Sequence, residues 1–269
     1  MKQRIITGVL AFLLLAVIFI VGTPAIIGLV FLVNLVGLYE FLKTIGAKAI
    51  LDYLVPMLFG TLILAVPIFI SENSEIKLEL LSLAVICIFM VNILSKKHDV
   101  TYSVFSIFGI IYVSLFLSYA VSILNLPDGI ALILSIIILC ICCDSFAYFI
   151  GVRFGKHKLC PSISPKKSIE GSIAGFVSTV IASGVIFLIF NAISETTYSI
   201  GIFLIGGVIV AVVSQFGDLS ASLIKRKFDK KDYGNLLPGH GGILDRIDSM
   251  LFSFASIYLY IKALMYLSM

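Results

Sequence analysis

The chain has 269 residues, of which 60% are hydrophobic and only 13% are charged. Soluble domains average about 45–50% apolar and about 25% charged residues, so this composition excludes a soluble globular protein. The formal net charge of +4 says little by itself, and we expect no nucleic-acid partner.

Nine apolar runs are long enough to cross a bilayer, which takes about 20 residues in a helix. Their approximate bounds are residues 5–21, 25–42, 50–70, 78–94, 101–122, 129–150, 171–190, 199–221 and 248–267. The first run resembles a signal peptide, but residues 22–24 lead straight into the second run. We therefore predict a retained first helix that forms a tight hairpin with the second.

These runs predict an all-α polytopic membrane protein with about nine transmembrane helices. We expect two parts. Residues 1–125 form an N-terminal bundle of generic membrane helices. Residues 126–269 form the catalytic part, with cytoplasmic loops at residues 151–170 and 222–247.

Lysine and arginine are concentrated in alternate loops. If the N-terminus is cytoplasmic, all but two of the 19 basic residues fall on the cytoplasmic side. The exceptions are Lys77, in an outer loop, and Lys262, near the outer end of the last helix. We predict a multi-pass protein of the inner (plasma) membrane with its C-terminus outside and its active site facing the cytoplasm.

Several apolar runs contain a carboxylate, which is costly near a bilayer without a partner. Asn34 and Glu40 are the main polar residues of the second run, and they either line a cavity or bond between helices. Asp144 lies in the sixth run, within the segment C-D-S-F-A-Y of residues 143–148. It pairs with a lysine, ligates a metal ion or supports a metal ligand, and the sequence does not separate these alternatives.

The loop before the seventh run contains S-P-K-K-S-I-E-G at residues 164–171. Ser168 is the predicted N-cap of the helix that follows. Because a helix N-terminus with adjacent lysines attracts anions, we predict that Lys166 and Lys167 contact phosphate. The alternative is that they only follow the inside-positive rule.

The eighth run ends with Ser214, Asp218, Ser222 and Lys225 at spacings of four, four and three. This spacing places the four side chains on one face of a helix. Asp218 needs a cation because it lies in an apolar run. Two alternatives remain, an ion pair with a nearby lysine and a magnesium site, since Mg²⁺ prefers hard oxygen ligands.

The segment P-G-H-G-G at residues 238–242 is followed by Asp245 and Asp248. The glycines allow backbone amides to approach an anion closely. Asp245 pairs with Asp218 around a metal ion, whereas Asp248 either caps the last helix or supports the site. For His240, a general base, a phosphate or metal contact, and a structural hydrogen bond all remain open.

Residues 222–248 resemble the signature of the phosphatidate cytidylyltransferase family. Its pattern is S-x-h-K-R-x4-K-D-x-G-x2-h-P-x-H-G-G-h-x-D-R-h-D, where h is apolar, and this chain fills every fixed position. The C-D-S-F-A-Y-F-I-G and S-P-K-K-S-I-E-G segments are also similar to that family. The resemblance extends over residues 143–248, and the N-terminal half matches only as generic membrane helix.

The resemblance implies that phosphatidic acid attacks the α-phosphorus of CTP and forms CDP-diacylglycerol and pyrophosphate. It also implies a Mg²⁺-dependent site, leaves open a second cation beside Mg²⁺, and implies a homodimer. The implied catalytic residues are Asp218, Asp245, Lys225, Arg226, Arg246 and His240. The implied substrate-binding residues are Lys166, Lys167, Ser168, Ser222, Lys231, Asp232, Gly241 and Gly242. The implied metal ligands are Asp218 and Asp245, with Asp144 and Asp248 in support.

Three other functions remain as alternatives. A CTP-dependent lipid kinase of the polyprenol type would transfer the γ-phosphoryl group and release CDP. An ion or solute transporter would leave CTP intact, and its polar groups would lie near the midplane in paired broken helices. A non-catalytic membrane scaffold would not require carboxylates in apolar runs.

Overall fold

A computed structural model describes residues 13–70, 74–95, 100–193, 198–236 and 241–267. The chain divides into two compact units. The first unit contains Met1–Asn125 and Lys227–Ile247, and the second contains Leu126–Arg226 and Asp248–Met269. Residues 227–247, which we grouped with the C-terminal helices, therefore pack with the N-terminal helices. Each unit is described by itself.

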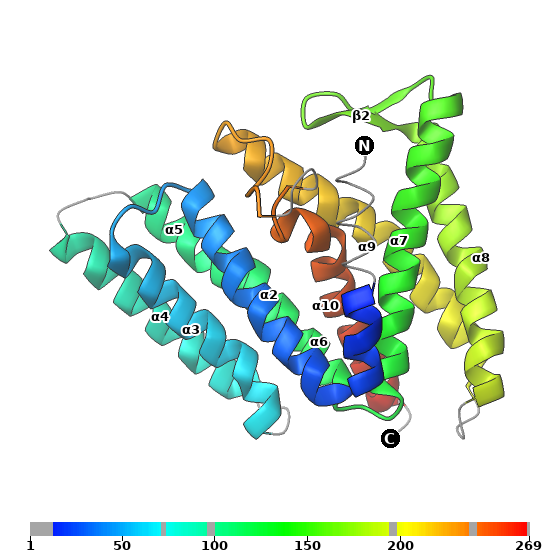
Figure 1. Ribbon diagram of the computed structural model, residues 1–269, viewed down its shortest axis with the longest axis horizontal. Coiled ribbons are helices and arrows are strands. Elements are labelled where there is room, and N and C mark those ends of the chain that lie inside the picture. The colour runs from blue at the N-terminus through cyan, green and yellow to red at the C-terminus, as the bar shows by residue number, and fades with distance from the viewer. Residues whose placement is uncertain (1–12, 71–73, 96–99, 194–197, 237–240, 268–269) are drawn as a thin grey trace. The chain divides into compact units, whose positions relative to one another are not determined.

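Helices form nearly all of the first unit (Figure 1). Residues 13–21 are helical, and the next helices are α2 (Thr23–Thr44), α3 (Ile50–Phe69) and α4 (Ser74–Leu94). The last span of the unit consists of α5 (Val100–Gly109), the π-helical turn η1 (Ile110–Leu115) and α6 (Phe116–Leu124). The helices α2, α4 and η1 all pack against α3.

The buried side of α2 forms the centre of this unit. Leu38, Phe41 and Leu42 are fully buried on it. Phe41 also contacts the rings of Tyr112 and Tyr233, with ring centroids 6.1 Å apart in each pair. This aromatic contact joins the loop after α9 to α2, so the chain segment at residue 233 is held by the first unit.

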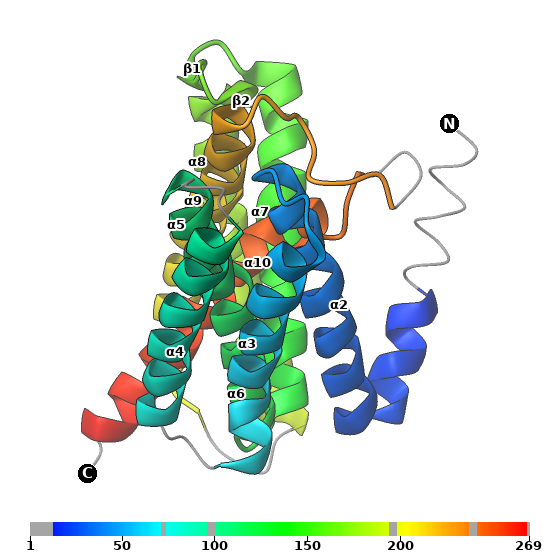
Figure 2. The ribbon, with the colours of Figure 1, turned by 90° about the vertical axis from the view of Figure 1, so that its left-hand side faces the viewer.

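The second unit consists of four helices and one β-hairpin (Figure 2). Its elements are α7 (Gly129–Phe154), β1 (Lys158–Cys160), β2 (Ser164–Ser168), α8 (Ile169–Ile193), α9 (Ile200–Lys227) and α10 (Leu244–Leu267) from residue 248 onward. The strands β1 and β2 pair antiparallel. The hairpin lies in the loop at residues 151–170, where the sequence analysis predicted no strand.

The helices confirm the predicted all-α membrane architecture. Within the described residues, eight helical spans are long and apolar enough to cross a membrane. They match the second to ninth predicted runs. Most of the first predicted run lies outside the described residues, although residues 13–21 are helical. Gly22, with φ 95°, separates them from α2, which has Pro24 in its first turn.

A close approach between α7 and α8 depends on Gly175. A Cβ atom added there would lie 2.8 Å from the carbonyl oxygen of Cys143, closer than side-chain carbons normally approach backbone. This contact lies one residue from Asp144. It therefore holds α8 against the part of α7 that presents a candidate site residue.

We expect Gly175→Ala to lower the Tm of the protein by about 3–10 °C, because overpacking forces the backbones apart and costs about 1–3 kcal/mol. Gly184→Ala is the matched control on the same helix, since a Cβ there would have Leu204 as its nearest neighbour at 3.8 Å. Thermal unfolding in detergent measures both variants. An equal Tm for the two would contradict the close approach.

Candidate functional site

A polar cavity of about 620 Å³ opens in the second unit. Residues from α7, the hairpin, α8 and α9 contribute its polar lining, which consists of Asp144, Tyr148, Lys158, Lys166, Lys167, Ser168, Ser172, Gln215 and Asp218. Five of these were predicted as site residues from the sequence: Asp144, Lys166, Lys167, Ser168 and Asp218. The fold therefore brings together residues that lie 74 positions apart along the chain, from 144 to 218.

Lys167 and Asp218 form an ion pair across this cavity. The distance from Lys167 Nζ to Asp218 Oδ2 is 2.6 Å, and both side chains are partly exposed. Lys167 is half-buried and Lys166 is exposed, and both lysines of β2 line the cavity. Of the two alternatives for Asp218, the structure thus shows the ion pair with a lysine. A magnesium ligand at Asp218 stays a prediction.

The hairpin is held in place by two contacts at the start of α8. Ser168 Oγ accepts a hydrogen bond from the backbone N–H of Gly171 at 3.2 Å, which confirms Ser168 as the N-cap. The Glu170 carboxylate contacts the ring Nδ1 of His157 at 2.7 Å, and it accepts the His157 backbone N–H at 3.2 Å. These contacts limit how far Lys167 can move from Asp218.

Three carboxylates influence one another in the second unit. Asp248 is buried, and the charges that act on it come from Asp218, Lys225 and Asp144. The hydroxyl of Ser249 donates a hydrogen bond to Asp144 Oδ2 at 3.2 Å. Helix α10 begins at Leu244, four residues earlier than predicted, so Asp248 is not its N-cap. The capping interpretation of Asp248 is therefore wrong.

The oxygen donors of this unit fit a magnesium ion. Within the part of the chain that the structure describes, no three His, Cys, Asp or Glu side chains lie close enough to hold a metal ion by themselves. Mg²⁺, however, usually takes only one or two protein carboxylates and completes its shell with waters and substrate phosphates. The carboxylates of Asp218, Asp248 and Asp144 are donors of that kind.

The predicted basic residues differ in their exposure. Lys225, on the last turns of α9, is 7% exposed. Arg226 is exposed, and its Nε donates to the carbonyl oxygen of Ile163 at 3.4 Å. Arg246, in the first turn of α10, is exposed, and Ser222 is half-buried. Lys225 is buried and its charge acts on Asp248, whereas the exposed arginines are accessible to a soluble anion.

Asp245 lies in the first unit and braces the loop that precedes α10. Its Oδ2 accepts the backbone N–H of Tyr233 at 2.9 Å and that of Gly242 at 3.0 Å. The amide of Gly242, which we expected to face an anion, is therefore bound to a carboxylate of the protein. A metal ion shared by Asp245 and Asp218, which lies in the second unit, stays a prediction.

For the other predicted residues of the loop at residues 231–242, the structure gives only exposure or backbone conformation. Lys231 and Asp232 are exposed on the loop, and Gly241 adopts φ 83°. His240 lies outside the described residues, so its three alternative roles stay predictions.

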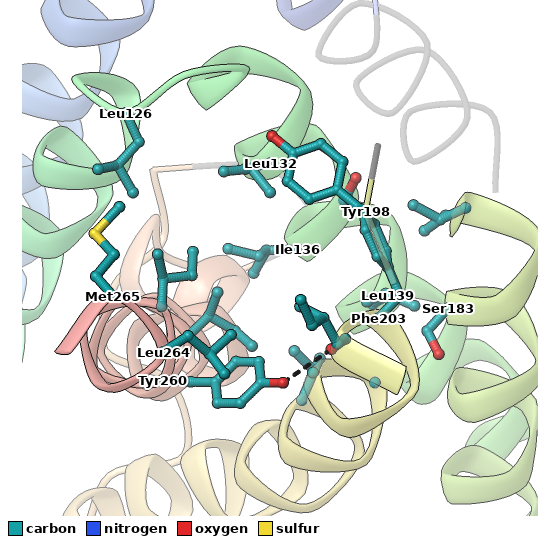
Figure 3. Close-up of a pocket in the computed structure, with 18 of the residues that line it drawn as sticks. Leu126, Leu132, Ile136, Leu139, Ser183, Tyr198, Phe203, Tyr260, Leu264 and Met265 are labelled. Atoms are coloured by element: carbon teal, nitrogen blue, oxygen red, sulfur yellow. Dashed lines mark hydrogen bonds between the residues drawn. The ribbon is translucent and has the colours of Figure 1, made fainter. Parts of the chain in front are cut away.

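A second cavity, of about 530 Å³, lies between α7, α8, α9 and α10 (Figure 3). Leu132, Ile136, Phe203 and Leu264 are typical of its lining, and none of the described residues around it is charged. Tyr260 donates its hydroxyl hydrogen to the carbonyl oxygen of Ile202 at 3.2 Å. Such a lining suits hydrocarbon and not phosphate, so the polar cavity is the candidate for the anionic parts of a substrate.

The sequence analysis missed several residues of the polar cavity. Gln215 and Ser172 line it and are hydrogen bonded to each other, and Lys158 was assigned only to membrane topology. Gln215 carries a usable signal, because it is a polar residue inside an apolar run and lies next to Ser214. No comparable signal existed for Ser172, since serine is common in membrane helices.

Comparison with known proteins shows the family of the chain. Residues 2–264 match the model of the cytidylyltransferase family. A phosphatidate cytidylyltransferase of Bacillus subtilis is 35% identical over 266 residues, which cover 96% of each chain. One of Staphylococcus haemolyticus is 33% identical over 94% of this chain and 95% of its own. A third, of Thermotoga maritima, is 41% identical over 61% of this chain and 60% of its own. The chain therefore belongs to the cytidylyltransferase family, and it is a multi-pass membrane nucleotidyltransferase.

Proposed function

We propose that the protein makes CDP-diacylglycerol and pyrophosphate from CTP and phosphatidic acid. The observation that supports this most is the complete signature at residues 222–248, together with relatives of nearly full length that are named phosphatidate cytidylyltransferase. A polar cavity with three lysines beside carboxylates is chemically suited to phosphate groups.

In this proposal the barrier is mainly electrostatic, since two anions must approach each other. Lys167 exchanges its contact with Asp218 for a substrate phosphate, and Arg226 and Arg246 neutralise further phosphate charge. The oxygen of phosphatidic acid is already an anion at neutral pH, so no strong general base is needed. The lipid enters sideways between helices, which keeps its acyl chains in hydrocarbon.

Magnesium, when bound, would neutralise and align the phosphates of CTP. Asp218 and Asp245 would hold it, and Asp144 and Asp248 would support them. The position of Asp218 within an apolar helix supports this part of the proposal, because a carboxylate there needs a cation and Mg²⁺ could take the place of Lys167 when the lysine binds a substrate phosphate.

We further propose that the protein is a homodimer of the inner membrane with its active site facing the cytoplasm. The distribution of lysine and arginine supports this orientation. CTP is soluble, so a site on this side would receive both the nucleotide and the lipid of the inner leaflet.

One assay tests the proposed reaction. Purified protein in detergent is mixed with CTP, phosphatidic acid and Mg²⁺, and pyrophosphate and the CDP-lipid are measured together. We expect equal amounts of both products, no turnover after EDTA treatment, and recovery when Mg²⁺ is added back. CDP in place of pyrophosphate would show a lipid kinase, and intact CTP would leave transport as the better proposal.

Lys77→Ala tests the proposed orientation. Lys77 Nζ donates to Ser118 Oγ at 3.1 Å and lies 5.0 Å from the ring centroid of Tyr119, so the variant removes local contacts only. We expect turnover within about twofold of the unaltered protein and a loss of stability of about 1 kcal/mol or less. A large loss of turnover at unchanged Tm would place Lys77 on the side of the active site.

A further inference from the structure

Glu40 is the one acidic residue of α2, and it is 5% exposed. Its carboxylate accepts two backbone hydrogen bonds from the start of α10. The N–H of Ile243 donates to Oε1 at 3.2 Å, and the N–H of Leu244 donates to Oε2 at 3.0 Å. Both carboxylate oxygens thus accept hydrogen bonds from residues more than 200 positions away in the sequence.

These amides belong to the N-terminus of a 24-residue helix. The first N–H groups of a helix have no partner within the helix, and together with the helix dipole they form an anion site. In this protein the anion at that position is a side chain from α2. A nucleotide phosphate would have to displace it, at the cost of leaving a carboxylate buried without its partners.

The loop is shaped around this carboxylate. A Cβ atom added at Gly234 or at Gly242 would overlap the carboxylate of Glu40, so a larger residue at either position would force this carboxylate to move. The ring of Tyr233 stacks on Phe41, the residue next to Glu40, at 6.1 Å between centroids. The two loop segments that flank residues 237–240 therefore both rest on the same end of α2.

The same loop segments hold Asp245. The amides that bind its Oδ2 belong to Tyr233 and Gly242, and both of these residues pack against Phe41 or Glu40. Removing the carboxylate of Glu40 would release the amides of Ile243 and Leu244 and open the space between Gly234 and Gly242. The position of the Asp245 side chain depends on all of these contacts.

We propose that Glu40 is a positioning residue of the cytidylyltransferase reaction. It acts as a built-in anion that closes the N-terminus of α10 to phosphate and fixes the signature loop so that Asp245 is held in place. This inference rests on the proposed function. It assigns an anchoring role to the N-terminal half of the chain.

The test compares Glu40→Ala and Glu40→Gln with the unaltered protein in the CTP and phosphatidic acid assay. We expect kcat to fall about 100-fold in the alanine variant, because misplacing a reacting group by about 1 Å costs a factor of this size. The glutamine variant keeps one acceptor oxygen and should lose only about tenfold. In the glutamine variant the KM for CTP and the half-saturating Mg²⁺ concentration should stay within about threefold, since Glu40 is not a proposed ligand of either and the loop that holds Asp245 keeps most of its contacts. In the alanine variant the displacement of Asp245 should raise the half-saturating Mg²⁺ concentration.

Asp52→Asn is the matched control. Asp52 is also a buried carboxylate of the first unit, and its Oδ2 accepts the backbone N–H groups of Lys48 and Ala49, both at 2.9 Å. It caps α3 instead of α10. We expect the control to lower Tm about as much as Glu40→Gln does while kcat stays within about twofold.

Hydrogen exchange gives a readout that does not depend on activity. In Glu40→Ala the amides of Ile243 and Leu244 should exchange at least about tenfold faster than in the unaltered protein, whereas those of Lys48 and Ala49 should not change. Unchanged exchange at residues 243 and 244 would overturn the proposal even if no reaction is detected.

Three kinetic results would also overturn it. A tenfold shift of the Mg²⁺ requirement in Glu40→Gln would make Glu40 a metal ligand. A large fall in the KM for CTP in Glu40→Ala would make the α10 N-terminus a phosphate site. An unchanged kcat in Glu40→Ala would remove the positioning role. If the unaltered protein forms no CDP-lipid, the proposed function fails, and hydrogen exchange still decides whether Glu40 anchors the loop.

Discussion

Asp218→Asn is expected to lower kcat by roughly 10²- to 10³-fold while the protein stays folded. Asparagine has nearly the same shape as aspartate, so α9 and its packing remain. The negative charge that now binds Lys167 at 2.6 Å disappears, and with it the oxygen donor that we propose for Mg²⁺. Steady-state kinetics at several Mg²⁺ concentrations measure the effect, and we expect a higher half-saturating concentration together with the lower kcat.

Asp128→Asn is the control for this variant. Asp128 lies in the same unit, just before the first residue of α7, and its Oδ2 accepts the hydroxyl hydrogen of Tyr198 at 3.0 Å. Its φ of 56° suits asparagine, which tolerates the left-handed region better than most residues. Its kcat should therefore stay within about twofold. Turnover of Asp218→Asn at the level of this control would remove Asp218 from the site.

Asp245→Asn is expected to lower kcat by about 100-fold or more and to lower Tm as well. The Asp245 carboxylate has two roles in our account, as a proposed metal ligand and as the acceptor of the N–H groups of Tyr233 and Gly242. The amide side chain keeps one oxygen for these donors but loses the charge, and charge-assisted hydrogen bonds are about twice as strong as neutral ones. Kinetics and thermal unfolding of the same preparation separate the two roles.

Asp229→Asn is the control in the same loop. Asp229 is exposed and has φ 52°, a conformation that asparagine also adopts, so both Tm and kcat should be close to those of the unaltered protein. If Asp245→Asn lowers Tm but leaves kcat and the Mg²⁺ requirement unchanged, Asp245 is a structural brace only, and the proposed metal site would have to rest on the second unit.

The variants of Asp218, Asp245 and Glu40 should differ in how kcat and the Mg²⁺ requirement change together. Loss of a metal ligand raises the Mg²⁺ requirement, whereas loss of a positioning residue lowers kcat at an unchanged requirement. Asp218→Asn belongs to the first pattern and Glu40→Gln to the second. Asp245 should show both, because it accepts hydrogen bonds from the anchored loop and is also a proposed metal ligand.

The membrane helices were predictable from the sequence because a backbone in hydrocarbon must satisfy its hydrogen bonds within the segment. Hydropathy alone therefore placed the eight described spans within a few residues of their observed bounds. The N-cap at Ser168 was also predictable, because its hydroxyl binds an amide only three residues away and the contact is therefore local in the sequence. The signature and its family were also readable, because they are patterns of contiguous residues.

The tertiary structure decided the contacts between residues that are distant in the sequence. The sequence identified Asp218 as a residue that needs a cation, but only the fold of the hairpin, 51 positions earlier, selected Lys167. Helix α10 begins at Leu244 instead of near residue 248, and a carboxylate on α2 accepts the amide of this first residue. Local residues determine which helices form and where chemistry is possible. The partners of each buried charge depend on which helices pack together. Charge–charge and amide–carboxylate contacts join residues that are distant in the sequence, so they produce no periodic sequence pattern from which they could be predicted.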